Sequence, residues 1–372
     1  MLQRLSVRHF RNLQQIELTF PRAVTVILGE NGHGKTSLLE SVYLLSDHEI
    51  VRSGSLKEVV QHGAAFAKVQ AGVGDDQIEM RLLQDVPGRF KKSFLENGAE
   101  RTSRKRTIPF YAVLFLPEEV RLFNGPPSRR RDWLDTICRK LYGGYHPQRL
   151  LYERLLKNRN ALLSDYLERG TLQVEVLDIL TAKMAAAAAS VWVGREQLVQ
   201  RILPYVRAFL QQIWGKDLKP ELVYEAPWKY AIGEADHAAI QRWFEDALHR
   251  DRPRELRAGR TMMGPHLDDL LPRLAGHAVG GMASRGELRS LSLSLKFAEV
   301  ALLESLTGQR PLLLLDDVMS ELDQPHRRKI EELTKGCQTI FTTTDLMFFS
   351  APFLAEAEVV TLAHGALVEA AA

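Results

Sequence analysis

The segment Gly29-Glu30-Asn31-Gly32-His33-Gly34-Lys35-Thr36 constrains the fold of this 372-residue chain more than any other stretch. Its spacing, G-x-x-x-x-G-K-T, is that of the phosphate-binding P-loop. A β-branched run at 24–28 precedes the segment, and apolar residues at helical spacing follow it. In a strand–loop–helix unit, backbone N–H groups and a helix N-terminus can face phosphate groups. The segment therefore predicts an α/β nucleotide-binding core near the start of the chain.

The motif assigns a role to each of its residues. Lys35 is expected to reach the β- and γ-phosphates, and the Thr36 hydroxyl is expected to ligate Mg²⁺. The expected ATP-binding residues are Gly29, Glu30, Asn31, Gly32, His33, Gly34, Lys35, Thr36 and Ser37. A glycine-rich turn that matches by chance is the alternative, and the flanking strand and helix patterns argue against it.

Composition excludes several classes of protein without selecting one. The net charge of +3, with 45% hydrophobic and 26% charged residues, is that of an ordinary globular protein. Two cysteines offer neither a disulfide framework nor a metal cluster, which favours a reducing, cytoplasmic environment. No signal-peptide pattern or run of about 18 apolar residues is evident, so no membrane association is expected.

The chain changes character twice. Strand-like pieces surround the P-loop up to Gly125-Pro126-Pro127, a mostly helical pattern then runs to about residue 258, and apolar strands return after Gly264-Pro265. We therefore expect a discontinuous α/β domain at 1–125 and 259–372 and a helical lobe at 126–258.

A second motif completes the expected ATP site. The apolar run 312–315 ends in Asp316-Asp317, the form of a Walker B strand. Asp316 is expected to reach the metal near Thr36, and Asp317 to polarise the attacking water. Lys35, Asp316 and Asp317 are thus the candidate catalytic residues.

The stretch Ala283-Ser284-Arg285-Gly286-Glu287 opens a helical pattern and allows two interpretations. Ser284 and Glu287 have the spacing of a helix capping box. Between the two ATP motifs, the same serine and glycine at a helix N-terminus also suit a phosphate sensor.

The complete set resembles the ABC-type ATPase heads of transporters, SMC proteins and DNA-repair ATPases. Residues 283–287 are similar to their signature motif, and Ser320-Glu321-Leu322-Asp323 resembles their D-loop. The resemblance implies a P-loop α/β core with an antiparallel β subdomain and a helical insert. It also implies dimers in which residues of one subunit complete the ATP site of the other. These residues are Ser284, Arg285, Gly286 and Glu287 of the signature and Asp323 of the D-loop.

Within that class the chain resembles the RecF family of SMC-like bacterial recombination and repair proteins. The resemblance is carried by residues 5–13, 125–135, 264–270 and 316–323, and by 342–346. It implies an ATP-dependent homodimer that binds duplex DNA near single-strand gaps, promotes recombinase loading with RecR- or RecO-type partners and is released by slow hydrolysis. DNA replication, recombination and the SOS response are the implied processes.

The chain departs from the family pattern at two places. Leu267 stands where the family usually has arginine, and residues 46–60 fit the pattern poorly. Thr344 stands where transporter heads have a switch histidine, which this family also lacks, and the substitution favours slow hydrolysis.

Two basic segments are candidates for DNA contact. One contributes Arg89, Lys91, Lys92, Arg104, Lys105 and Arg106, and the other Arg129 and Arg131. A solvated hairpin is an equally good interpretation of the first segment. At about 100° per residue, Arg130 falls in line with the apolar stripe of its helix and is expected to be partly buried, whereas Arg129 and Arg131 flank the stripe.

Two other functions remain open. An ATPase subunit of a nuclease or anti-phage system would share the head but depend on a partner for cleavage. An ABC transporter subunit is disfavoured because roughly 280 residues separate Lys35 from Asp316.

Overall fold

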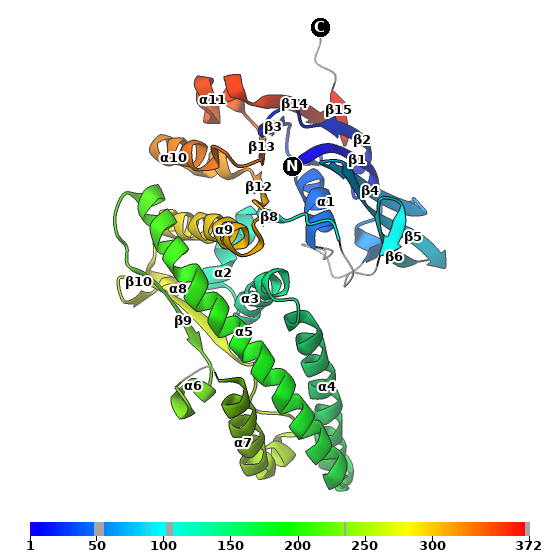
Figure 1. Cartoon of the computed structure of the whole chain (residues 1–372), viewed down its shortest axis with the longest axis vertical. Helices are drawn as coiled ribbons and strands as arrows, with labels where there is room; N and C mark the ends of the chain where they lie inside the picture. Colours follow the sequence, from blue (N-terminus) through cyan, green and yellow to red (C-terminus); the bar gives the residue numbers. More distant parts are fainter. Residues whose placement is uncertain (48–55, 87, 102–106, 234–235, 369–372) are drawn as a thin grey trace. The chain divides into compact units, whose positions relative to one another are not determined.

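The computed structural model describes residues 1–47, 56–86, 88–101, 107–233 and 236–368 (Figure 1). The described chain divides into two compact units. The first comprises 1–119, 212–215 and 293–372, and the second 120–211 and 216–292. We propose, as the sequence predicts, that residues 1–125 and 259–372 form one domain and that residues 126–258 form another.

The first unit contains a six-stranded antiparallel sheet in the order β2-β1-β4-β5-β6-β7. Its strands are β1 (Leu2–Phe10), β2 (Leu13–Thr19), β4 (Phe66–Val73), β5 (Asp76–Val86), β6 (Arg89–Glu96) and β7 (Ala99–Arg101). Asn97 and Gly98 both have positive φ, 49° and 78°, and join β6 to β7. Side chains alternate between faces, so Leu5, Val7, Val69 and Met80 lie in the core.

A second six-stranded sheet has the order β15-β14-β3-β13-β12-β8. The strands β8 (Ala112–Phe115), β12 (Leu312–Asp316), β13 (Thr339–Thr343), β3 (Val24–Leu28) and β14 (Glu358–Ala363) are parallel, and β15 (Ala366–Val368) is antiparallel to β14. β12 lies between β8 and β13 and is buried at every position, as expected for a central strand.

Helix α1 (Lys35–Asp47) packs against strands of both sheets. Its apolar face, Leu38, Leu39, Val42 and Leu45, shares one core with β1, β4 and β5 on one side and β12 on the other. The P-loop helix is therefore fixed by two sheets. The remaining helices of this unit are α10 (Gln324–Thr334) and α11 (Ala351–Glu356), with residues 293–307 of α9 (Arg285–Thr307).

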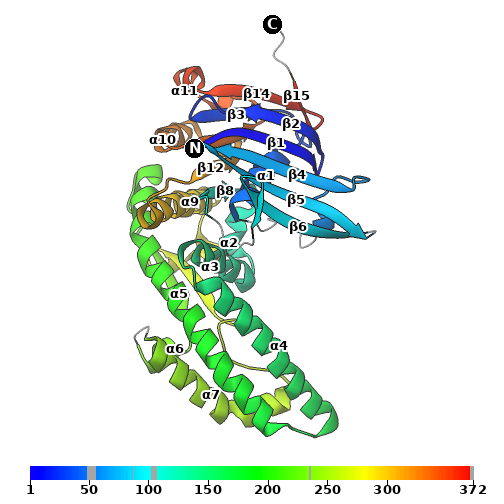
Figure 2. The same ribbon diagram turned by 45° about the vertical axis from the view of Figure 1, so that its right-hand side comes forward.

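The second unit is built mainly from helices (Figure 2). They are α2 (Arg121–Asn124), α3 (Pro127–Leu141), α4 (Tyr145–Arg169), α5 (Val174–Trp214), α6 (Trp228–Ala231), α7 (His237–Ala258) and α8 (Val279–Met282). α4 and α7 end at Gly170 and Gly259, both in the left-handed region that favours glycine. Arg159 and Glu255, both fully buried, form an ion pair of 2.6 Å that links α4 to α7.

The second unit also contains a three-stranded sheet, of which two strands lie in the region after Gly264-Pro265 where strands were expected and one was not expected. β9 (Pro220–Glu225) pairs with β10 (Asp269–Leu274), which pairs with β11 (His277–Ala278). β9 falls inside the segment predicted as mostly helical. Leu222 and Tyr224 alternate with more exposed neighbours, which is the pattern of a strand.

Helix α5 is the one helix among the described residues that is long and apolar enough to cross a membrane. Half of its apolar window is buried inside the fold. The alanines at 185 and 187–189 are almost completely buried, which explains the apolar composition by packing.

Candidate ATP site and basic surfaces

The P-loop lies between β3 and α1 and adopts a conformation that requires its glycines. Gly34 has φ 102°, and a Cβ there would lie 2.7 Å from a methyl carbon of Leu13. A Cβ on Gly29 would lie 2.4 Å from the Leu362 carbonyl oxygen. Real Cβ atoms do not approach this closely, so the loop wraps tightly because these positions lack side chains.

The Lys35 amine lies within this loop. Its Nζ donates to the carbonyl oxygens of Gly29 at 2.6 Å and Glu30 at 3.0 Å. Burial lowers the pKa of Lys35, and the carboxylates of Asp317 and Asp316 oppose that shift. The amine is therefore held beside the two acids at the phosphate-binding turn.

Thr36 and the Walker B strand meet directly. The Thr36 hydroxyl donates to Oδ2 of Asp316 at 2.7 Å, and the Thr342 hydroxyl donates to Oδ1 of Asp316 at 2.7 Å. Asp316 ends β12 and Thr342 belongs to β13, so the two neighbouring parallel strands orient the carboxylate. The hydroxyl and the carboxylate are hard oxygen donors that fit Mg²⁺, which takes its other ligands from water and phosphate. The described residues contain no cluster of three or more His, Cys, Asp or Glu suited to a metal.

Asp317 has a strained and electrostatically unusual position. Its φ is 48°, in the left-handed region, and its backbone N–H donates to the Thr342 hydroxyl at 3.0 Å. Its Oδ1 is buried with no hydrogen-bond partner. Burial raises the pKa of Asp317 and Asp316 raises it further, whereas Ser320 and Lys35 lower it. Backbone strain and an unsatisfied carboxylate oxygen are features found at functional sites.

Asn12 supports the P-loop, a contact that the sequence analysis did not identify. Its Nδ2 donates to the Gly32 carbonyl at 2.9 Å, and its Oδ1 accepts from the Ser37 hydroxyl at 2.8 Å. The neighbouring Arg11 pairs with buried Glu40 on α1 at 2.7 Å. The turn between β1 and β2 thus holds the middle of the loop and the first turns of α1. The sequence indicates a turn at Arg11-Asn12, because these residues separate two alternating runs. Residue spacing does not reveal that Asn12 contacts the P-loop.

The candidate signature residues lie in the second unit at the start of α9. Ser284 and Glu287 form a reciprocal capping box: the Ser284 N–H donates to Glu287 Oε2 at 2.8 Å, and the Glu287 N–H donates to Ser284 Oγ at 3.3 Å. Ser284, Arg285 and Gly286 are exposed. The structure therefore contains the capping box. Because Ser284, Arg285 and Gly286 are exposed, they are also accessible to a phosphate, and phosphate sensing is a proposal.

Asp323 of the candidate D-loop caps α10. Its Oδ1 accepts from the His326 N–H at 3.1 Å, and the hydrogen bonds from His326 lower the pKa of Asp323. The Ser320 hydroxyl donates to the Asp317 carbonyl at 2.9 Å, which connects this segment to the Walker B strand.

The first basic segment does not form a single patch. Arg89, Lys91 and Lys92 are exposed on β6. Because side chains alternate along a strand, Arg89 and Lys91 lie on the face opposite the core and Lys92 on the other face. Arg104, Lys105 and Arg106 lie outside the described residues.

Three further cations join Arg89 and Lys91 on that face. Arg8 of β1 is paired with Lys68 of β4, and Lys68 with Arg81 of β5. Buried Glu79 contacts both Lys68, at 3.1 Å, and Arg81. Like charges on directly opposite residues of neighbouring strands destabilise a sheet. The single carboxylate of Glu79 compensates only part of the positive charge of Arg8, Lys68 and Arg81. Strand register, which spacing does not reveal, brings these residues together.

The second basic segment is partly structural. As predicted, Arg130 is buried, and its guanidinium forms a bidentate pair with Asp269 at 2.7 and 2.8 Å. Arg129 is exposed. Arg131, expected to be freer than Arg130, is half-buried and donates to the Asp268 carbonyl at 2.7 Å. Only part of its guanidinium remains for another partner.

A buried polar network links the stretch 264–270 to α4, α5 and β9. Asp268 accepts from the Tyr224 hydroxyl at 2.6 Å and from the Trp192 indole N–H. The Tyr152 hydroxyl and His266 Nδ1 are 2.6 Å apart. Burial raises the pKa of Asp268 to about 6 and lowers that of His266 to about 4. Leu267, the departure from the family pattern, is 57% exposed.

The parallel sheet, the P-loop with its helix and the adjoining Walker B acids define an ATP-binding head of the ABC type. Residues 1–360 match the family model for the RecF/RecN/SMC N-terminal domain. The fold alone is also similar to that of an SMC head bound to the C-terminal winged-helix domain of ScpA, with a TM-score of 0.53 and 15% identity.

The chain belongs to the RecF family of DNA replication and repair proteins. It is 31% identical to DNA replication and repair protein RecF of Lactobacillus gasseri over 98% of both chains. It is 33% identical to the RecF protein of Synechococcus sp., covering 98% of this chain and 96% of that protein. A structure of the recombination mediator protein RecF with ATP has a TM-score of 0.86 at 29% identity and covers 100% of this chain and 97% of that one.

Proposed function

We propose that this protein is a recombination mediator that binds ATP and Mg²⁺, dimerises on ATP and holds duplex DNA near single-strand gaps to promote recombinase loading. The observation that carries the proposal is the direct contact of Thr36 with Asp316, which joins the P-loop to the Walker B strand. The RecF protein in the similar structure is described as a recombination mediator bound to ATP.

In this proposal the residues around the P-loop divide the chemistry. The Lys35 amine exchanges its contacts with the Gly29 and Glu30 carbonyls for the β- and γ-phosphates. Thr36 and Asp316 hold Mg²⁺, which neutralises phosphate charge when bound. Asp317 orients the attacking water with its carboxylate. Ser284 and Gly286 of a second copy approach the γ-phosphate, and Asp323 lies at the same contact between subunits.

Hydrolysis serves as a timer in this scheme. Thr344, at the end of β13, has no imidazole to contact the γ-phosphate, so turnover is slow. The dimer persists while ATP is intact and releases DNA after hydrolysis. RecR- or RecO-type proteins are the proposed partners, because the relatives are mediators of the RecFOR pathway.

The basic face of the antiparallel sheet is the proposed DNA surface. Arg8, Lys68, Arg81, Arg89 and Lys91 share that face, and phosphate contacts supply most of the affinity of sequence-independent DNA binding. Arg129 is a secondary candidate because it is exposed. Arg131 is a weaker candidate because it is half-buried, and Lys92 is weaker because it lies on the other face of the sheet.

Fluorescence anisotropy with gapped and intact duplexes at several salt concentrations tests this function. Affinity should be higher with ATP than with ADP, higher for the gapped duplex, and should fall steeply with salt. Arg8→Glu with Arg89→Glu should lower the slope of log affinity against log salt by about one to two units, whereas Arg154→Glu on α4 should not change it. A slope near zero in the unmodified protein would contradict direct DNA binding.

A further inference from the structure

The distal half of α7 carries a concentration of positive charge that the ATP site does not use. Residues 250–260 contain five arginines and two acids, whereas the whole chain has a net charge of only +3. Arg250, Arg254 and Arg257 are exposed and fall within about 60° of one another around the helix. None of the three makes an ion pair with a residue that the structure describes.

Four of the nearby acids have cationic or hydroxyl partners. Glu255 is buried against Arg159, and Asp178 contacts Arg252. On α4, Asp165 pairs with Arg169 at 3.1 Å, and Glu168 accepts from the Ser164 hydroxyl at 3.4 Å. Asp246 lies one turn before Arg250, and Asp251 on the flank of the stripe. The arginine stripe therefore retains an excess of positive charge.

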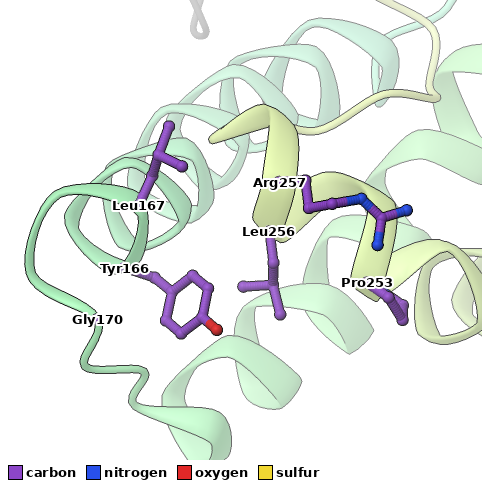
Figure 3. Close-up of a pocket in the computed structure, with 6 residues that line it drawn as sticks. All are labelled: Tyr166, Leu167, Gly170, Pro253, Leu256 and Arg257. Carbon is purple, nitrogen blue, oxygen red and sulfur yellow. The ribbon is translucent and has the colours of Figure 1, made fainter.

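A pocket of about 470 Å³, lined by both apolar and polar groups, adjoins this stripe (Figure 3). It lies between the C-terminal ends of α4 and α7, where the Tyr166 ring and the Leu256 side chain are on facing sides. Leu167, Pro253 and Arg257 also line it. Leu167 is 56% exposed. One of its methyl carbons would lie only 2.9 Å from a Cβ added to Gly259, so Leu167 is close to the end of α7. The pocket thus offers apolar side chains from α4 and α7, is open to solvent and is bordered by arginine.

We infer that the end of the α4–α7 pair is a docking site for an acidic peptide segment of another protein that carries a bulky apolar side chain. The apolar side chain occupies the pocket between Tyr166 and Leu256. Neighbouring carboxylates pair with Arg254 and Arg257, whose guanidinium groups suit bidentate contacts. Tyrosine and arginine around a central apolar anchor are the composition of protein interaction hot spots.

The pocket distinguishes this partner from a nucleic acid. A phosphate backbone would use the arginines but would leave the apolar side chains of the pocket exposed, because phosphates and sugars bury little apolar surface there. A peptide uses both features at once. The site lies apart from the P-loop residues in sequence, and the inference does not depend on ATP or duplex DNA.

The test uses the full-length protein without nucleotide and a fluorescein-labelled peptide of Asp and Glu residues around one central phenylalanine. We expect saturable binding, and about tenfold weaker binding of the same peptide with alanine in place of phenylalanine, since an apolar ring is no longer buried. Arg254→Glu with Arg257→Glu should weaken binding at least tenfold. Arg242→Glu, on the same helix roughly 22 Å from Arg257, should leave it within about twofold.

A double-mutant cycle isolates the pocket. Leu256→Ser should weaken the phenylalanine peptide to the affinity of the alanine peptide and should leave the alanine peptide unchanged. Equal affinity for the two peptides, or no binding of the acidic peptide, would overturn the inference. Binding of oligo(dT) that displaces the peptide and is lost with Arg254→Glu and Arg257→Glu would also overturn it and would assign the surface to nucleic acid.

Discussion

The Thr36 hydroxyl donates to Asp316 Oδ2 at 2.7 Å, although the two residues are 280 positions apart. The contact exists because β3 and β12 flank β13 in one parallel sheet, so the P-loop and the Walker B acid leave the same edge. A nucleotide site that depends on both ends of the chain requires the first unit to be folded before ATP binds.

Asp316→Asn should weaken ATP binding at least tenfold in the presence of Mg²⁺, because the substitution removes the charge that balances the cation. In EDTA the variant and the unmodified protein should bind ATP with similar affinity. Titration with a fluorescent ATP analogue, with and without Mg²⁺, measures both values. An equal loss of affinity in both conditions would mean that Asp316 supports the loop rather than the metal.

Asp317→Asn should retain ATP binding, reduce turnover about 100-fold or more and raise Tm by a few degrees. The pKa of Asp317 is raised by burial, so the ionised form present at pH 7 costs stability in the folded protein, and the amide removes that cost. Thermal unfolding and phosphate release measure the two effects. The same substitution at Asp323, whose pKa is lowered by His326, should not raise Tm. Turnover that is unchanged in Asp317→Asn would remove Asp317 from the mechanism.

Asn12→Ala should weaken ATP binding by about five- to thirtyfold, because two hydrogen bonds that fix the P-loop are lost. Asn12→Asp, which keeps the acceptor for Ser37 but loses the donor to Gly32, should have an intermediate effect. Gln15→Ala, at an exposed position of β2, serves as the control. Calorimetric titration with ATP gives the order of affinities, and an Asn12→Ala variant as tight as the control would show that the loop holds its shape without this turn.

The pH dependence of stability should reveal His266 and Asp268 with opposite signs. The folded pKa of His266, about 4, lies below its usual 6.5, so the unfolded chain binds the proton first and stability falls as the pH drops through this range. The folded pKa of Asp268, about 6, lies above 3.8, so its contribution rises as the pH drops from about 6. His266→Asn should therefore reduce the loss of stability between pH 6.5 and 4.5, and Asp268→Asn should increase it. Urea unfolding at both pH values measures this, and shifts of the same sign would contradict the assignment.

Local motifs were sufficient to predict the candidate ATP site. The register between neighbouring strands could not be predicted from the sequence. The P-loop and the Asp316-Asp317 strand carry fixed spacings, and helical periodicity was sufficient to predict that Arg130 is buried. The contact of Asn12 with the P-loop depends on how β1 and β2 pair, and the row Arg8, Lys68 and Arg81 depends on the register of three strands. β9 was missed because its six residues are a short alternation between long helices.

We propose that ATP assembles two copies of this protein through Ser284. Light scattering of the purified protein with ATP, with ADP and without nucleotide tests it most directly, using Ser284→Arg and, as a matched control, Ala258→Arg at an exposed position of α7. We predict dimers only with ATP for the unmodified protein and the control, and a monomer that still binds ATP for Ser284→Arg. An ATP-dependent dimer that persists in Ser284→Arg, or a mass that does not respond to nucleotide in the unmodified protein, would contradict the account.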